Sequence, residues 1–461
     1  MDSSTEENDS DYFDDQNSGS EIEDHESQTS DDDEEIDLEN LKLNDNSTWQ
    51  SSYNSKSGMT WLSTPNYSMK TSCSNDNAAQ AGLTEVTANI SSIEDAFLSF
   101  IPEKMLEKIL VYSNFEYSRN VTSTEKSKEI TMIELKGFIG LLLLADLLGK
   151  SKTDVKCLWR RSPLESPIFK ATMSRSRFQK IIAHLRFDDK NTREERKKKD
   201  KFAAIREVWS YFPDNLQKSY IPGYNVTIDE QLLGFRGKCP FRQYMPKKPD
   251  KYGLKLWLCV DVDSHYVFNA SPYLGRQPME KRQTQIGAKV VLELLKPLYG
   301  LSRNATMDNF FTSVPLAKEL QAKNLSLIGT LRKNKSEIPM EFLSNKNREV
   351  GSSLFGFQDG LTLVSFVPKY NKAVLLFTSK HHDSQVDKQT GKPIVILDYN
   401  KTKGAVDTVK RATKRWPLCI FYGMIDIAAI NAMIIWKTKN PQWNQNIKHK
   451  RRLFLEELGL A

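Results

Sequence analysis

The sequence predicts an α/β protein in which a mostly helical N-terminal region precedes a mixed sheet with flanking helices. Two patterns support this fold class. From about residue 90 to 220 the apolar side chains recur at helical spacing, and from about residue 224 onwards strand-like alternation takes turns with helical spacing. The 461 residues are also enough for two or three folded units.

The N-terminal segment is predicted to be a disordered acidic tail over residues 1–85. Of the 59 acidic residues, 18 lie in residues 1–40, which contain no Lys or Arg, and a stretch rich in Ser, Asn and Thr follows. This composition cannot bury enough apolar surface to offset chain entropy. The remaining 41 acidic residues face all 65 basic ones, so the rest of the chain carries a charge of +24 and favours an anionic partner, above all nucleic acid.

The cysteines and the apolar runs exclude several classes of protein. Five widely spaced cysteines with no CxxC or CxxH spacing argue against a disulfide framework, and no zinc is expected in this chain. No signal-peptide pattern opens the sequence. The most apolar run, 137–149, is interrupted by Asp146 and is too short to cross a bilayer. We therefore expect a protein of a reducing compartment with no membrane partner.

Residues 86–222 are predicted to be helical. Helical apolar spacing begins after a cap at Ser92 and recurs in 131–149, 174–189 and 200–212. The basic stretch "TREERKKKDK" (192–201) is predicted to be an exposed loop. It is either a solvated surface or a patch for a DNA backbone or nuclear import.

The α/β half carries acidic residues where its strands end. The strand "YNVTIDEQ" contains Asp229, a hairpin follows over 252–275, and a short strand ends at Asp308 before a helix capped by Ser313. Residues 335–395 are rich in strands and loops, as an insertion would be. A helix is then predicted through "TKGAVDTVKRATKRW", which contains Asp407, and an apolar helix follows it.

Two acids at strand ends and one on a later helix are the arrangement of a ribonuclease-H-like core. Clustered carboxylates repel one another unless a cation neutralises them, and Mg²⁺ or Mn²⁺ accepts such hard oxygen ligands. The alternative is that Asp229, Asp308 and Asp407 are turn or cap residues. The same applies with more force to Asp261 and Asp263 in the hairpin turn, and we expect Glu230 to form a structural ion pair.

Four long motifs closely resemble the piggyBac transposase family. They are "VTIDEQLLGFRGKCPFRQYMPKKPDKYGLKLW" (226–257), "MDNFFTS" (307–313), "DYNKTKGAVDT" (398–408) and "RATKRWPLCIFYGMIDIAAINA" (411–432). The resemblance runs from about residue 90 to 461. It implies that Asp229, Asp308 and Asp407 are catalytic acids that bind Mg²⁺, in a nuclear protein that acts as a homodimer. The implied reaction is the cutting and joining of DNA, transposon ends included, at TTAA targets.

The sequence departs from the family in two places. About nine residues are missing after Thr408, and with them a fourth acid, to which Lys410 is the nearest counterpart. The sequence also stops before the Cys/His-rich zinc module of many family members. Two alternatives therefore stay open: a domesticated, catalytically inactive DNA-binding protein of the nucleus, and a ribonuclease or structure-specific nuclease built on the same core.

Basic residues near these acids are the candidate DNA contacts. Near a phosphodiester site they would position the strands, with aromatic side chains available for base stacking, although a solvated rim around core aromatics is the alternative. The candidates are Arg236, Lys238, Arg242, Lys247, Lys248, Lys251, Lys255, Lys410, Arg411, Lys414, Arg415 and Trp416.

The predicted organisation is as follows. A helical dimerisation and DNA-binding region (86–222) precedes a catalytic core (223–334 and 396–415) that an insertion (335–395) interrupts. C-terminal helices (416–461) pack back on the helical region.

Overall fold

The computed structural model describes residues 51–65, 80–119, 129–160, 166–278, 284–344, 346–404, 411 and 413–461. The chain divides into two units, Met1–Ser47 and Thr48–Ala461, and every described residue belongs to the second unit. Asp407 and Lys410 lie outside the described residues, as does most of the predicted acidic tail.

The centre of the fold is a mixed sheet of five strands. They are β5 (Asn225–Gly234), β7 (Tyr252–Asp261), β8 (Val267–Pro272), β9 (Asn304–Met307) and β10 (Ser326–Thr330). The first three form an antiparallel meander, and β9 and β10 run parallel to β5, in the spatial order β8-β7-β5-β9-β10. This order of three antiparallel and two parallel strands is that of a ribonuclease-H-like core, which confirms the predicted fold class.

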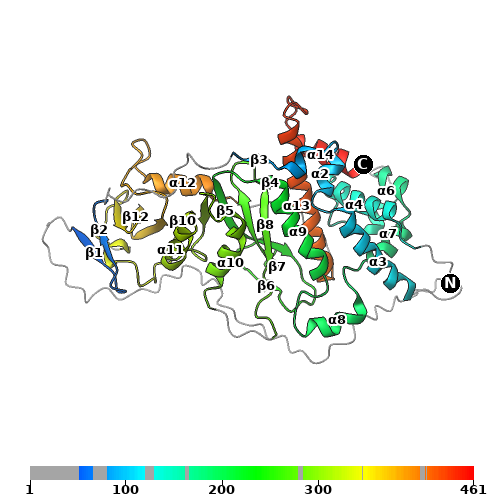
Figure 1. Ribbon diagram of the computed structural model, residues 1–461, viewed down its shortest axis with the longest axis horizontal. Helices are drawn as coiled ribbons and strands as arrows, with labels where there is room; N and C mark the ends of the chain where they lie inside the picture. The colour runs from blue at the N-terminus through cyan, green and yellow to red at the C-terminus, as the bar shows by residue number, and fades with distance from the viewer. Residues whose placement is uncertain are drawn as a thin grey trace. The chain divides into compact units, whose positions relative to one another are not determined.

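The region predicted as an insertion extends this sheet. Its strands are β11 (Ser353–Gln358), β12 (Leu361–Lys369) and β13 (Lys372–Thr378), and β13 pairs antiparallel with β10. In Figure 1 this part of the sheet, labelled at β12, lies on the far side of β10 from β5. Continuous backbone pairing therefore joins the insertion to the catalytic core. On the other edge of the sheet the two-residue strand β6 (Gln243–Tyr244) pairs with the start of β7.

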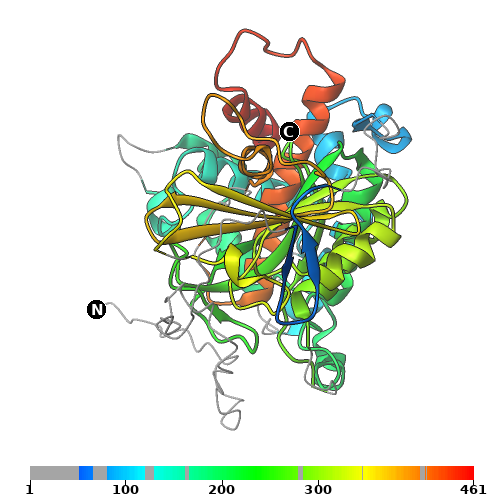
Figure 2. The same ribbon diagram turned by 90° about the vertical axis from the view of Figure 1, so that its left-hand side faces the viewer.

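Residues 51–65 were predicted to be disordered, and this prediction is wrong. They form the hairpin strands β1 (Ser52–Asn54) and β2 (Thr60–Leu62), and β2 pairs with β11. Trp61 is only 1% exposed, and its indole N–H donates to the Glu337 carbonyl at 2.9 Å. In Figure 2 this hairpin lies nearest the viewer, at the end of the extended sheet. The buried Trp61 thus helps to anchor to the sheet a segment whose polar composition resembles that of a disordered tail.

Helices flank the central sheet. They are α10 (Ile286–Leu295), α11 (Val314–Ala322) and α12 (Ile394–Thr402), with short 3-10 turns at Lys296–Leu298 and Met340–Phe342. As predicted, the Ser313 hydroxyl caps α11 by accepting from the Leu316 N–H, and a proline stands in the first turn. α12 contacts β5, β10 and β13 and ends at Thr402.

The N-terminal region is helical, as predicted. Its helices are α1 (Glu85–Ala88), α2 (Ile93–Leu98), α3 (Glu103–Arg119), α4 (Met132–Leu147), α5 (Val155–Leu158), α6 (Pro167–Thr172), α7 (Arg175–His184), α8 (Lys190–Lys197) and α9 (Arg206–Ser219), with a small sheet of β3 (Gly82–Leu83) and β4 (Tyr220–Ile221). Most of "TREERKKKDK" is helix α8 instead of the predicted loop, because Asp189 caps its first turn.

Two helices close the fold. α13 (Trp416–Lys439) contacts α2 and β5, and α14 (Lys450–Leu460) packs on α4, where the backbones of Gly140 and Gly459 approach too closely for a side chain. α13 is long and apolar enough to cross a membrane, but 89% of its most apolar window is buried inside the protein, so it serves here as a core helix. The prediction of a helix through 402–416 is wrong where the structure describes this segment: Thr402 ends α12 and Trp416 begins α13, while Lys403, Gly404, Arg411 and residues 413–415 are not helical.

Candidate active site

The two strand-end acids lie side by side on the central sheet. Asp229 is on β5, and Asp308 is the first residue after β9. Because β5 and β9 are parallel with Ile228 opposite Met307, the two aspartates follow at the same level of neighbouring strands. Paired strands are about 4.8 Å apart. The parallel pairing of β5 with β9 therefore brings these two carboxylates together.

The environment of this acid pair disfavours negative charge. Burial, followed by the charges of Glu230 and Asp229, raises the pKa of Asp308 to about 6, against the opposing effects of the Phe310 N–H and Lys255. Burial and then Glu230 also raise the pKa of Asp229. One backbone N–H donates to each carboxylate, from Glu230 to Asp229 at 2.8 Å and from Phe310 to Asp308 at 3.0 Å. The acids thus sit where an added cation would stabilise their ionised forms.

Glu230 is a third carboxylate close to this pair. The sequence predicted only a structural ion pair for it. It does form one, because the Lys248 ammonium lies 3.3 Å from its carboxylate and also donates to its backbone carbonyl at 3.2 Å. Its other carboxylate oxygen, Oε2, is buried and accepts no hydrogen bond from any described residue. Its position directly after Asp229 in a buried strand was the sequence signal that could have predicted its effect on the pKa values of Asp229 and Asp308.

Lys255 places a cation next to the same acids. Its side chain comes from β7 and is buried, and its ammonium lies 4.8 Å from the ring centroid of Phe310 and 5.6 Å from that of Trp257. Burial lowers the pKa of Lys255, while Glu230 and Asp308 oppose that effect. Of the predicted DNA contacts that the structure describes, Lys255 and Lys248 lie close to these acids.

The end of α12 lies against the acid pair. The hydroxyls of Thr402 and Thr306 are 2.7 Å apart, two residues before Asp308 on β9. Burial raises the pKa of Tyr399, and the charges of Asp308 and Asp229 add to this, which places the Tyr399 side chain in the field of both acids. The chain therefore leaves α12 beside the site as it runs towards Asp407. That residue lies outside the described residues, so its role as third acid stays a prediction.

Two carboxylates on neighbouring strands suit Mg²⁺ or Mn²⁺, which prefer oxygen ligands. A cation bound between them would lower the pKa values of both carboxyl groups, which burial and their acidic neighbours raise. Within the described parts of the chain, no group of three His, Cys, Asp or Glu side chains is arranged to hold a metal ion. A complete ligand set would thus need a further ligand, such as Asp407, water or a phosphate oxygen.

Most of the remaining predicted DNA contacts between β5 and β7 are accessible. Lys248 is half-buried against Glu230. The exposed residues of this group are Arg236, Lys238, Arg242, Lys247 and Lys251. The loop that follows β5 also approaches the segment before α13, since a Cβ atom on Gly237 would lie 2.5 Å from the Lys414 carbonyl oxygen.

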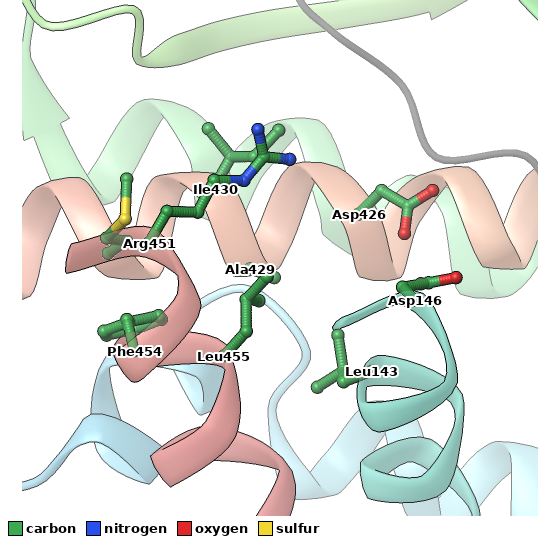
Figure 3. Close-up of a pocket in the computed structure, with 9 residues that line it drawn as sticks. Leu143, Asp146, Asp426, Ala429, Ile430, Arg451, Phe454 and Leu455 are labelled. Atoms are coloured by element: carbon green, nitrogen blue, oxygen red, sulfur yellow. The ribbon is translucent and has the colours of Figure 1, made fainter. Parts of the chain in front are cut away.

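The predicted DNA contacts of residues 411–416 are used mainly inside the protein. The Arg411 guanidinium is buried and pairs with Asp146 of α4 and, at 2.8 Å, with Asp426 of α13. Figure 3 shows the two aspartates on their facing helices. Burial raises the pKa of Asp426 to about 6 although Arg411 opposes this. Because Arg411 is enclosed between two acids, a DNA phosphate cannot reach it in this structure.

Arg415 and Trp416 are likewise internal. The Arg415 guanidinium donates to the backbone carbonyls of Ile182, at 2.8 Å, and Leu185, at the end of α7. The Trp416 ring stacks on Phe202 at 5.6 Å and meets Phe241 edge-on at 5.0 Å. The exposed residue of this stretch is Lys414. The helical region thus holds the start of α13 through side chains that we had predicted to face DNA.

The fold and the acid pair define the class of protein, and comparison with known families agrees with it. The profile of the Transposase IS4 family matches residues 94–433. Among solved structures, the chain is similar to the piggyBac transposase in a cryo-EM structure of its synaptic complex with hairpin DNA. The two are 37% identical with a TM-score of 0.78, and the match covers 83% of this chain and 82% of that one. The chain belongs to the piggyBac transposase family, as the motifs predicted.

Curated human relatives are more distant. The chain is 25% identical over 394 residues to human PiggyBac transposable element-derived protein 3, which covers 78% of this chain and 64% of that protein. It is 25% identical over 247 residues to human PiggyBac transposable element-derived protein 2, which covers 52% of this chain and 40% of that protein. The chain thus spans less than two thirds of the length of these relatives.

Proposed function

We propose that this protein cuts and joins DNA by metal-dependent phosphodiester transfer. The observation that carries the proposal is the pair of Asp229 and Asp308 at one level of two parallel strands, both with raised pKa values and no internal cation sufficient to reverse the shift. A transposase fold supports DNA as the substrate, as does the likeness to a piggyBac transposase solved with hairpin DNA. In line with the family resemblance, TTAA is the proposed target, and we propose a homodimer that works in the nucleus.

Each acid has a stated role in this proposal. Asp229 and Asp308 would hold Mg²⁺ or Mn²⁺, with Asp407 as the third ligand. A metal bound there would lower the pKa of the attacking water or 3′-hydroxyl and stabilise charge on the phosphate. Lys255, whose ammonium lies near the rings of Phe310 and Trp257, neutralises part of the carboxylate charge, and the pairing of β5 with β9 holds Asp229 and Asp308 next to each other. The exposed lysines between β5 and β7 hold the DNA backbone.

A second function is supported by separate observations. The human relatives are by name transposable element-derived proteins, and this chain has about nine fewer residues after Thr408 than the family pattern. Just beyond that point Arg411 is enclosed by Asp146 and Asp426. A domesticated DNA-binding protein without cleavage activity would keep this packing and the basic surface. Its departure from the family would be confined to the missing residues after Thr408 and the fourth acid among them.

One assay separates the two functions. Purified full chain is incubated with a transposon-end duplex flanked by TTAA and with Mg²⁺, Mn²⁺ or EDTA, and both cleavage and strand transfer are measured. The matched variants are Asp229→Asn, Asp308→Asn and, as a control, Asp263→Asn at an exposed hairpin-turn acid of the same sheet. The enzyme is supported if wild type and Asp263→Asn cut with metal while the other two variants do not. Metal-independent DNA binding without any cleavage by wild type would establish the second function instead.

A further inference from the structure

Two exposed tyrosines face each other at the edge of the sheet. Tyr244 on β6 is directly opposite Tyr252 on β7, so both side chains project from the same face. Their ring centroids are 4.8 Å apart with an interplanar angle of 40°. Tyr244 is 56% and Tyr252 41% exposed. Two large aromatic rings are thus held together in water instead of being buried.

A guanidinium packs against one of these two tilted rings. The Arg242 guanidinium lies 5.5 Å from the Tyr252 ring centroid. It is held there because it donates 2.9 Å hydrogen bonds to the backbone carbonyls of Arg236 and Gly237. Arg242 is therefore fixed against Tyr252, and the more exposed ring, Tyr244, is left open to a further flat group.

The surroundings of the two rings are cationic. The loop between them carries Lys247, Lys248 and Lys251, and its ends are joined by a 2.6 Å hydrogen bond from the Met245 N–H to the Lys251 carbonyl. Lys247 and Lys251 are exposed, whereas Lys248 is tied to Glu230 beside the acid pair. A flat group that stacks here on an anionic chain would meet complementary charge on both sides.

The rings also lie at a useful distance from the acid pair. The separation can be estimated along β5. Gly253, next to Tyr252, is paired with Gly234, and Gly234 is five residues along β5 from Asp229. At about 3.4 Å per residue this is roughly 17 Å. A DNA strand advances about 3.4 Å per nucleotide, so the rings are on the order of five nucleotides from the acids.

We propose that Tyr244 and Tyr252 form a stacking platform for an unpaired base of a DNA strand, with Lys247 and Lys251 contacting its phosphates. A base inside a duplex has both faces covered by its neighbours, so the platform selects a strand end, an overhang or a hairpin loop. Every base has a flat face, and the contact therefore carries little sequence preference. The inference rests on the proposed function only in taking DNA as the partner and requires no cleavage.

The test uses the full chain in EDTA, so that cleavage plays no part. The probe is a short duplex with a single-stranded overhang that contains 2-aminopurine, and a blunt duplex of the same length is the comparison. We expect the wild-type protein to quench the fluorescence of the overhang. Tyr244→Ala and Tyr252→Ala should lose this quenching and bind the overhang about 5- to 100-fold more weakly, with less than a twofold change on the blunt duplex.

Three controls make the result specific. Tyr244→Phe and Tyr252→Phe keep the ring and should keep the quenching, and Tyr370→Ala removes an exposed tyrosine between β12 and β13, on another part of the sheet, and should change nothing. Wild-type protein that binds the blunt duplex without quenching the overhang would overturn the platform and leave the proposed function standing. Equal losses on both DNAs in the alanine variants would overturn it too, since they would indicate a general structural role.

Discussion

Two acidic sites at the central sheet have opposite designs. Asp398 on α12 accepts hydrogen bonds from the Lys380 ammonium at 2.7 Å and from the His381 ring at 2.8 Å. Burial opposes its ionisation, but these two bonds outweigh burial and lower the pKa of Asp398 to about 2. Asp308 lies beside the last turn of the same helix. There Lys255 lowers the pKa of Asp308 by less than burial and Glu230 raise it, and the pKa is about 6.

Under the proposed function, this difference is that between a structural acid and a metal-binding one. At Asp398 the chain supplies its own cations, so the charge is neutralised as soon as the protein folds. Around Asp229 and Asp308 the nearby cations do not offset burial and the neighbouring carboxylates, so both pKa values stay raised, and the proposed metal would supply the missing positive charge. The "HHD" stretch (381–383) is a loop, and its His381 contributes a partner to the structural site.

The largest expected effect is that substitution at Asp308 abolishes DNA cleavage but not stability, whereas substitution at Asp398 lowers stability but not cleavage. Asp308→Asn should reduce metal-dependent DNA cleavage by at least about 100-fold, on the scale of losing one electrostatic contact to a transition state. It should do so without lowering the protein's stability. Asp398→Asn should cut DNA at a temperature where it remains folded. Cleavage assays beside thermal unfolding check both, and equal loss of cleavage in the two variants would erase the distinction.

The next largest effect concerns the buried pairing of Arg411. Arg411→Met leaves Asp146 and Asp426 buried without their shared cation, which should lower the free energy of unfolding by about 3–5 kcal/mol. Urea denaturation measures this. Replacing the acids as well, in Asp146→Asn/Arg411→Met/Asp426→Asn, should recover part of the loss. A single variant as stable as wild type would show that this cluster contributes nothing to holding α13.

A smaller loss is expected at the structural acid. Asp398→Asn should cost about 1–3 kcal/mol, because it removes the charge that Lys380 and His381 bond. The folded-state pKa lies below the unfolded value, so the contribution is present above about pH 4 and is lost as the pH falls towards about 2. Denaturation curves of the variant and wild type should therefore converge in strong acid. A difference that stays constant from pH 7 to pH 2 would contradict the assignment.

The smallest effect is the opposite pH dependence at Asp308. Its folded-state pKa is raised, so its stabilising contribution is complete below about pH 4 and is lost as the pH rises through about 6. In EDTA, wild type should lose stability over this interval relative to Asp308→Asn. Thermal unfolding at half-unit pH steps is the measurement. A wild-type profile parallel to that of the variant would mean that Asp308 is not perturbed.

Local sequence was sufficient to predict the elements that frame the site. Alternation around Asp229, the short strand before Asp308 and the Ser313 cap each depend on neighbours within one element. The unpredicted features are long-range. Trp61 orders the β1–β2 hairpin through a contact 276 residues away, and Arg411 meets Asp146 across 265 residues. Such contacts leave no periodic signal, so a basic cluster that resembled a DNA surface could not be distinguished from an internal ion pair.

The most direct test of the account is metal binding by the acid pair. Thermal unfolding with 0 or saturating Mg²⁺ is measured at pH 7.5 and pH 5.0 for wild type, Asp229→Asn, Asp308→Asn and Asp398→Asn. We predict that Mg²⁺ raises the Tm of wild type and Asp398→Asn, more at pH 7.5 than at pH 5.0, because the ion binds only ionised carboxylates. The first two variants should not respond. A Tm shift of the same size in Asp308→Asn as in wild type would contradict a metal site at Asp229 and Asp308.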